Sequence, residues 1–217
     1  MKKETKQNFG ITCILLGAFV VWTAAVRLVD VQLIGPQGSA VGFATINGWV
    51  HDLTGAHMAL YTVTDWLGLV PIAFAIGFAL LGLIQWIHRK HIRKVDFSIL
   101  VLGGFYLLVM AAYVLFEMLV INYRPVLING CLEVSYPSST TMLVLCVMPT
   151  AIMQLNTRIK SKTLKRCAAF GITAFIIFMV IGRLLSGVHW FTDIVGGALL
   201  SAGLVMLYHS ITSLEIK

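Results

Sequence analysis

The chain has 217 residues, of which 59% are hydrophobic and only 12% are charged, and its net charge at neutral pH is +7. A water-soluble domain of this length needs far more charged surface, so the composition excludes an ordinary soluble protein. The basic residues lie in short runs between apolar segments and form no single patch, which argues against nucleic-acid binding.

Six apolar stretches are long enough to cross a hydrocarbon core, which takes roughly 20 residues per helix. They cover residues 9–29, 66–87, 97–120, 139–156, 168–187 and 190–211. Nearly all other residues belong to short connectors. We therefore expect one integral membrane domain over residues 1–217, folded as an all-α bundle of six transmembrane helices. The longest connector, 30–65, is expected to contain a short interfacial helix near Ile46–Leu53.

The distribution of Lys and Arg predicts the orientation of this bundle. With six spans, the N-terminal segment, the connectors around 88–94 and 158–166 and the C-terminus share one side. That side holds 13 of the 16 basic residues and is expected to be cytoplasmic, with both termini inside. The remaining three, Arg27, Arg124 and Arg183, belong to the outer side, where topology does not call for them.

The sequence predicts neither a metal site nor a cofactor. The four cysteines, Cys13, Cys131, Cys146 and Cys167, show no CxxC or Cys/His spacing, so neither a disulfide framework nor a zinc site is expected. No acidic cluster suited to magnesium accompanies the outer residues. Any phosphoryl chemistry here is therefore expected to be metal-free.

Three short outer segments carry side chains suited to a phosphate group. Arg124 and Arg183 offer forked, permanently charged donors. The run Pro137-Ser138-Ser139 opens the fourth span, and a helix N-terminus with free N–H groups and nearby hydroxyls favours an anion.

The third segment adds a possible nucleophile. His189 and Asp193 are four residues apart at the start of the last span, so they share one helix face. The carboxylate can hold one imidazole nitrogen and leave the other free to attack phosphorus. Positioned positive charge and an in-line nucleophile are what phosphoryl transfer needs.

This pattern resembles the three-part signature of the type 2 phosphatidic acid phosphatase superfamily, whose membrane members have six helices and an outward site. The matching residues are Arg124-Pro125, Pro137-Ser138-Ser139 and Arg183-x5-His189-x3-Asp193, within about residues 110–200. The resemblance implies hydrolysis of a lipid phosphate or polyprenyl diphosphate through a phosphohistidine on His189, which Asp193 orients.

The resemblance also implies that phosphate is bound by Arg124, Arg183, Ser138 and the backbone at Ser139. Two positions depart from the family pattern. Glu117 stands where the first motif begins with a lysine, so one phosphate-binding cation is missing. Thr140 stands where the second motif ends in the histidine that protonates the leaving oxygen. A smaller departure is Gly182, which precedes Arg183 where the family has a serine.

Thr140 leaves three interpretations open, because a threonine hydroxyl cannot act as an acid near neutral pH. The chain is a natural protein with weak or lost hydrolase activity, or the acid was deliberately replaced, or another group supplies the proton. His51 and His57 are the other outward histidines. Loss of a general acid typically costs 10²–10⁴-fold in rate.

Glu117, near the outer end of the third span, has a functional and a structural interpretation. It pairs with an arginine or contacts an amine-bearing substrate, or it is an interfacial acid whose side chain reaches water. In the last span, Gly196 and Gly197 are expected to let the helix approach a neighbour closely.

The sequence thus predicts a multi-pass phosphatase of a bacterial cell membrane, with an outward site, a phosphate-bearing lipid as its substrate and no nucleic-acid partner. Polyprenyl phosphates, phosphatidic acid and phosphatidylglycerophosphate all fit this substrate class. A lipid-phosphate binder or transporter without catalysis is the alternative. A secondary transporter without lipid chemistry would show internal symmetry between its halves, which the sequence lacks. The oligomeric state stays open.

Overall fold

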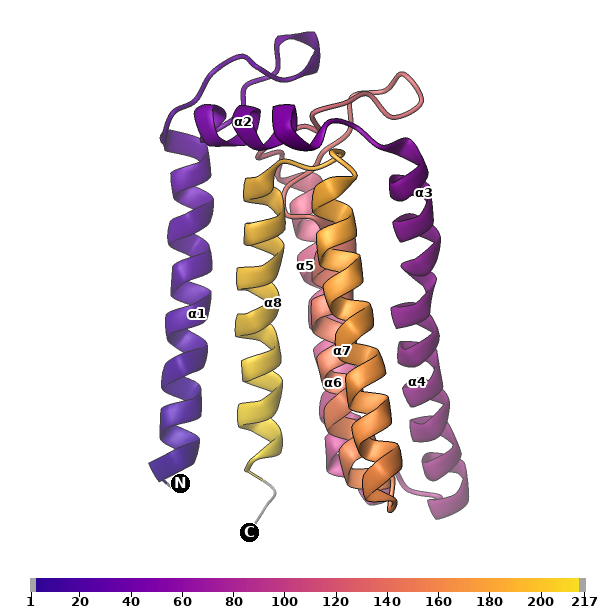
Figure 1. The fold of residues 1–217 in the computed structure, drawn as a ribbon. Coiled ribbons are helices and arrows are strands. Elements are labelled where there is room, and N and C mark those ends of the chain that lie inside the picture. The colour runs from indigo at the N-terminus through magenta and orange to yellow at the C-terminus, as the bar shows by residue number, and fades with distance from the viewer. Residues whose placement is uncertain (1–2, 215–217) are drawn as a thin grey trace.

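The computed structural model describes residues 3–214 and is all-helical (Figure 1). Its α-helices are α1 (Lys3–Leu28), α2 (Ala44–Thr54), α3 (Met58–Leu67), α4 (Leu69–Arg89), α5 (Phe97–Met118), α6 (Ser139–Arg158), α7 (Lys162–Leu185) and α8 (Phe191–Thr212). Two 3₁₀ turns, η1 (Pro36–Gly38) and η2 (Ile92–Lys94), lie in connectors.

Within residues 3–214, six segments are long and apolar enough to cross a membrane, which confirms the predicted number of spans. The second span, Met58–Arg89, is 32 residues long and consists of α3 and α4. It begins eight residues before the expected start, because the polar residues of α3 hid its helical character. α3 and α4 meet at Gly68, where the helix is interrupted. Pro71 explains the interruption, since it has no N–H to donate to the carbonyl of Leu67.

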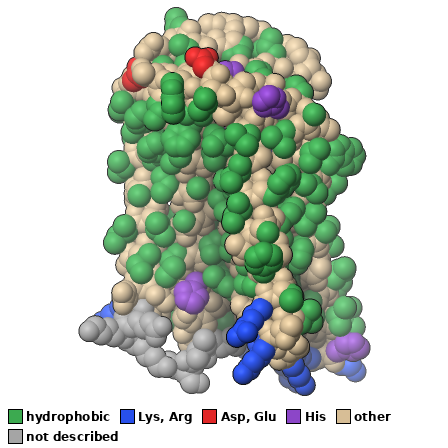
Figure 2. Space-filling model, viewed as in Figure 1, with side chains coloured by type: hydrophobic (Ala, Val, Ile, Leu, Met, Phe, Trp, Pro, Cys, Tyr) green, Lys and Arg blue, Asp and Glu red, His purple; other side chains and the backbone are tan. Residues whose placement is uncertain are grey.

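α2 lies across one end of the bundle, where a short helix near Ile46–Leu53 was expected (Figure 1). The start of α1 and the end of α8 lie together at the opposite end. There the Lys and Arg side chains gather, whereas acidic side chains appear near α2 (Figure 2). We refer to these as the basic end, defined by residues 89–94 and 158–166, and the α2 end.

α6 and α8 form the middle of the bundle. Half of the residues in the most apolar part of each of these two helices are buried, compared with about a fifth in the other four spans. Small residues allow this packing. A Cβ on Gly196 would come within 2.6 Å of the Tyr136 ring, and one on Gly197 within 3.2 Å of the Ser138 carbonyl oxygen. The expected role of Gly196 and Gly197 in close approach is therefore confirmed.

The outer helices expose their large apolar side chains, as a protein surrounded by lipid does. The hydrophobic side chains cover the sides of the bundle between its two ends (Figure 2). Examples more than two-thirds exposed are Ile14, Val21, Leu107, Met118 and Phe170. The charged groups are thus confined to the ends, which is the distribution that a bilayer imposes.

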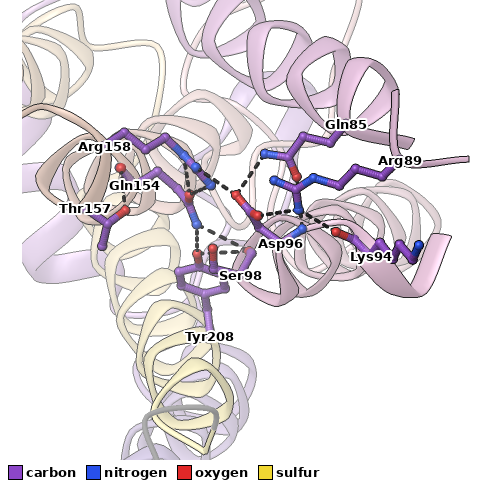
Figure 3. A network of polar contacts seen from close by, with 9 residues as sticks. All are labelled: Gln85, Arg89, Lys94, Asp96, Ser98, Gln154, Thr157, Arg158 and Tyr208. Carbon is purple, nitrogen blue, oxygen red and sulfur yellow. Dashed lines mark hydrogen bonds and ion pairs between the residues drawn. The ribbon is translucent and has the colours of Figure 1, made fainter. Parts of the chain in front are cut away.

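A polar network ties four helices together at the basic end (Figure 3). Asp96 accepts hydrogen bonds from Gln85 at 2.8 Å, Arg89 at 2.9 Å and Arg158 at 3.0 Å. The Arg158 guanidinium also donates to Gln154, which reaches the hydroxyl of Tyr208 on α8. One carboxylate next to the first turn of α5 therefore links α4 and α6, and Gln154 extends the link to α8.

We expect Asp96→Asn to loosen this end of the bundle. Burial raises the pKa of Asp96, but the hydrogen bonds from Gln85, Arg89 and Arg158 lower it more, so the carboxylate stays charged at neutral pH. Stability from such a group is lost only as the pH falls through the lowered pKa. Loss of about 1 kcal/mol should lower the thermal unfolding midpoint in detergent by about 2–4 °C.

Asp52→Asn is the matched control, because Asp52 forms no ion pair within residues 3–214. Equal unfolding midpoints for the two variants at neutral pH would show that the network contributes nothing.

α3 and α7 pack closely through Gly182. A Cβ there would lie 2.8 Å from Cγ2 of Thr64, which is so close that one of the two helices would have to shift. We expect Gly182→Ala to cost roughly 1–3 kcal/mol, as overpacking does. Adding Thr64→Ser removes Cγ2, keeps the hydroxyl and should restore the unfolding midpoint. A double variant as unstable as Gly182→Ala alone would contradict this contact.

Candidate functional site at the α2 end

The start of α8 is built around the carboxylate of Asp193, which is fully buried. One oxygen accepts the backbone N–H of Trp190 at 3.0 Å, so Asp193 caps its own helix from the third helical position. The other oxygen accepts the side-chain amide of Asn122 at 3.2 Å. The carboxylate therefore joins the last span to the segment that follows α5.

His189 stands immediately before this cap, with its ring between Asp193 and Arg124. Nδ1 lies 3.7 Å from Oδ2 of Asp193, and Nε2 lies 3.2 Å from Nη1 of Arg124. A guanidinium can only donate hydrogen bonds, so Nε2 must be the acceptor and the ring proton belongs on Nδ1. This tautomer leaves the lone pair of Nε2 directed away from Asp193.

The electrostatic surroundings keep the imidazole of His189 neutral. Burial lowers its pKa well below the usual range, and the positive charges of Arg124 and Arg183 lower it further. A neutral imidazole is the form of histidine that can act as a nucleophile.

Arg124 is positioned by a short hairpin that spans residues 122–135. Its backbone N–H donates to the carbonyl of Glu133 at 2.9 Å, and the N–H of Ser135 donates to the carbonyl of Asn122 at 3.0 Å. The indole N–H of Trp190 holds the carbonyl of Tyr123 at 2.7 Å. The hairpin thereby fixes the Arg124 side chain against the start of α8.

Arg124 also has an acidic partner on the same hairpin. Its Nε lies 3.0 Å from a carboxylate oxygen of Glu133, in an ion pair whose angles do not make a hydrogen bond. Its Nη1 donates weakly to the carbonyl of Val188 at 3.4 Å. One N–H of this guanidinium has no hydrogen-bond acceptor, and the side chain of Glu133 is exposed. Phosphate oxygens can therefore replace Glu133 as the partner of Arg124.

Arg183 is almost fully buried, and its guanidinium contacts three residues of α3. Nη1 donates to the hydroxyl of Thr64 at 3.3 Å, and Nη2 lies 3.7 Å from the carboxylate of Asp65. The guanidinium carbon stands 4.9 Å from the centre of the Tyr61 ring, which Arg124 also approaches at 6.0 Å. One aromatic ring is thus shared by both cations.

Sequence reasoning missed these three α3 residues. Tyr61, Thr64 and Asp65 recur at the spacing of one helix face, which was the available signal. The signal was overlooked because residues 30–65 were assigned to a connector.

The N-terminus of α6 contributes differently from what the motif suggested. Ser138 is fully buried, its hydroxyl accepts from Thr141 at 3.0 Å, and its N–H donates to the carbonyl of Asp193 at 3.1 Å. Ser138 therefore secures α6 against α8 and does not line the pocket. Ser139, the first residue of α6, does line it.

A small pocket brings several of the expected residues together. Arg124, Ser139 and His189 line it, and so does Glu117. Its empty space is about 310 Å³, including the open mouth. Arg183 is not among the lining residues. In the part of the chain that the structure describes, no three His, Cys, Asp or Glu side chains gather as metal ligands would.

A larger apolar groove opens next to this pocket, between α4 and α5 with α6 as its floor. It has about 1600 Å³ of empty space counting its open side. Thr140 and Asp65 lie at its α2 end, and a second apolar hollow continues it towards Trp86 at the basic end. Thr140 thus faces the groove and is absent from the lining of the small pocket.

The two histidines considered as alternative proton donors, His51 and His57, lie outside both cavities. His51 is on α2, where its ring packs 5.6 Å from that of Trp190, and His57 precedes α3. Burial lowers the pKa of His51. Neither lines the pocket or the groove, so the geometry does not favour them as proton donors.

Known proteins resemble the chain in two respects. Residues 120–217 match the sequence model of the PAP2 superfamily. A crystal structure of a transmembrane PAP2-type phosphatidylglycerolphosphate phosphatase from Bacillus subtilis superimposes with a TM-score of 0.64 at 18% identity, covering 94% of this chain and 96% of the other. No curated protein matches the chain.

The match covers the segments with Arg124, Ser139, His189 and Asp193, and the similar fold extends over nearly the whole chain. The resemblance inferred from the three motifs is confirmed for residues 120–217, which match the PAP2 superfamily.

Proposed function

We propose that this chain is a PAP2-superfamily membrane phosphatase that hydrolyses a lipid phosphate or polyprenyl (di)phosphate through a phosphohistidine on His189. The observation that carries the proposal is the placement of His189. Its Nδ1 faces Asp193, and its Nε2 lies 3.2 Å from Arg124, in a pocket that Ser139 also lines. Nucleophile, orienting carboxylate and phosphate-binding cation are therefore in mutual reach.

Phosphate binding would begin with exchange of partners. In the structure the Arg124 guanidinium donates a hydrogen bond to Nε2 of His189 and forms an ion pair with Glu133. Phosphate oxygens that bind Arg124 bidentately would draw it away from Nε2 and expose the lone pair to phosphorus. Ser139 at the start of α6 would offer its N–H and hydroxyl to the same oxygens.

Phosphoryl transfer would place a positive charge on the imidazole, and Asp193 would stabilise it through Nδ1–H. Arg183, whose guanidinium packs on the Tyr61 ring, would add a second positive charge nearby. Electrostatic stabilisation of this kind is the main contribution that a protein makes to phosphoryl transfer. Water would then attack the phosphohistidine, release phosphate and restore the imidazole.

The groove supports a lipid as the substrate. It is open between α4 and α5, apolar along its length and ends beside Ser139, which also lines the phosphate pocket. A lipid could leave its tail in the groove while its phosphate reaches His189. The similar protein from Bacillus subtilis, a phosphatidylglycerolphosphate phosphatase, acts on a phosphate of this class. Phosphatidic acid and polyprenyl phosphates share its chemistry.

The orientation follows from charge. The connectors at the basic end carry nine Lys and Arg residues, so this end would face the cytoplasm of a bacterial cell and the α2 end would face outward. His189 would then act at the level of the outer headgroups.

A lipid-phosphate binder without catalysis is the second candidate, and Thr140 is the observation that favours it. A hydroxyl there cannot protonate a leaving alkoxide near neutral pH. This candidate predicts that lipid phosphate binds, yet that phosphate is released neither by the natural chain nor by Thr140→His.

Phosphate release from a panel of lipid phosphates in detergent tests the first proposal. We expect release by the natural chain and a loss of at least about 10³-fold in His189→Ala, because a nucleophile cannot be replaced by its neighbours. His209→Ala is the matched control, since His209 is exposed on α8 near the basic end. Equal release by His189→Ala and the control would exclude His189 as the nucleophile.

The orientation has a natural reporter in Cys131, an exposed cysteine at the tip of the hairpin at the α2 end. We expect a membrane-impermeant maleimide added to intact cells to label Cys131, with no labelling in Cys131→Ser. In that background, Lys90→Cys should react only after the cells are opened. Labelling of Lys90→Cys in intact cells would reverse the proposed orientation.

A further inference from the structure

We propose that Glu117 is the proton donor for the leaving oxygen and replaces the acid that is missing at Thr140; this rests on the proposed phosphatase function. In the substrate pose described above, the leaving oxygen joins the phosphate to the lipid. It must therefore lie where the small pocket meets the apolar groove.

Three residues line both cavities and so mark this junction: Tyr113, Ser139 and Met142. Tyr113 and Glu117 are four residues apart on α5, so they share the helix face that looks at the junction. Glu117 lines the same pocket as His189 and Arg124. Glu117 is therefore one helical turn from the junction.

The other acids of the site already have partners. Glu133 pairs with Arg124, Asp65 pairs with Arg183, and Asp193 is held by Trp190 and Asn122. Within residues 3–214, Glu117 takes part in no ion pair. Its near neighbour is the hydroxyl of Tyr113, so Glu117 is the carboxyl at this site that no cation holds.

Substrate binding would supply the protonated form. A dianionic phosphate beside the Glu117 carboxylate favours uptake of a proton, because adjacent negative charges repel. The lysine found at this position in the family would instead bind the phosphate. By that resemblance the chain has an acid in place of a cation at Glu117 and no acid at Thr140, and in the proposed reaction Glu117 compensates for Thr140.

The proton balance closes over both half-reactions. In the first, Nε2 of His189 bonds to phosphorus, the bond from phosphorus to the lipid oxygen breaks, and that oxygen takes the proton of Glu117. In the second, water attacks the phosphohistidine and gives its proton to the Glu117 carboxylate. Phosphate leaves, the bonding pair returns to Nε2, and Glu117 is protonated again.

The test compares two leaving groups in the full chain. Dioleoyl phosphatidic acid has an alkyl leaving group that needs a proton, whereas the leaving group of para-nitrophenyl phosphate needs none. We expect Glu117→Gln to lose about 10²–10⁴-fold in kcat on phosphatidic acid, the contribution of a general acid, and to keep its activity on the aryl phosphate. Retained aryl activity also proves that the variant is folded.

The controls separate this inference from the function on which it rests. Asp52→Asn should match the natural chain on both substrates, and His189→Ala should be inactive on both. If the natural chain hydrolyses neither substrate, the proposed function itself fails. A natural chain that is active on both, with equal losses on both in Glu117→Gln, would overturn the role in proton transfer.

Unchanged hydrolysis of phosphatidic acid by Glu117→Gln would also overturn that role. Phosphatidic acid has no amine, so this result would point instead to Glu117 as a contact for a cationic headgroup.

Discussion

The buried carboxylate of Asp193 is the group on which the arrangement of the α2 end depends. It caps α8, holds Asn122 of the hairpin and faces Nδ1 of His189. A buried carboxyl group is costly unless its oxygens accept hydrogen bonds, and the N–H of Trp190 and the amide of Asn122 supply them. The hairpin cannot move away from α8 without breaking the hydrogen bond from Asn122 to this carboxylate. Arg124, which the hairpin positions, is held near His189 for the same reason.

The sequence was sufficient for the architecture, because a bilayer leaves few alternatives. Span number follows from apolar length, and the position of charged residues follows from the cost of burying them in hydrocarbon. The boundary of the second span was the exception. α3 places Tyr61, Thr64 and Asp65 against Arg183, and these polar residues made a helix look like a connector. Hydropathy fails where a helix faces a charged site in place of lipid.

For the site, sequence reasoning could find side-chain chemistry but not the direction in which each side chain points. His189 and Asp193 came from helical spacing, and their contact with one another follows from it. Ser138 has the residue type of a phosphate ligand, yet its hydroxyl and its N–H both bind protein partners. These hydrogen bonds of Ser138 depend on packing between α6 and α8, which no local sequence pattern encodes. The hairpin that holds Arg124 did have a local signal, the pair Asn129-Gly130, which is typical of two-residue hairpin turns and which the sequence analysis did not use.

For the proposed lipid substrate, the groove between α4 and α5 has an energetic consequence for selectivity among lipid tails. A tail that slides into it from the bilayer exchanges one hydrocarbon environment for another, so no hydrophobic gain accompanies the transfer. Discrimination among acyl or prenyl chains must then come from shape and from the ordering of a flexible tail, both of which are weak. The headgroup would dominate affinity. A protein of this design would accept lipids of varied chain length and select among them by what surrounds the phosphorus atom.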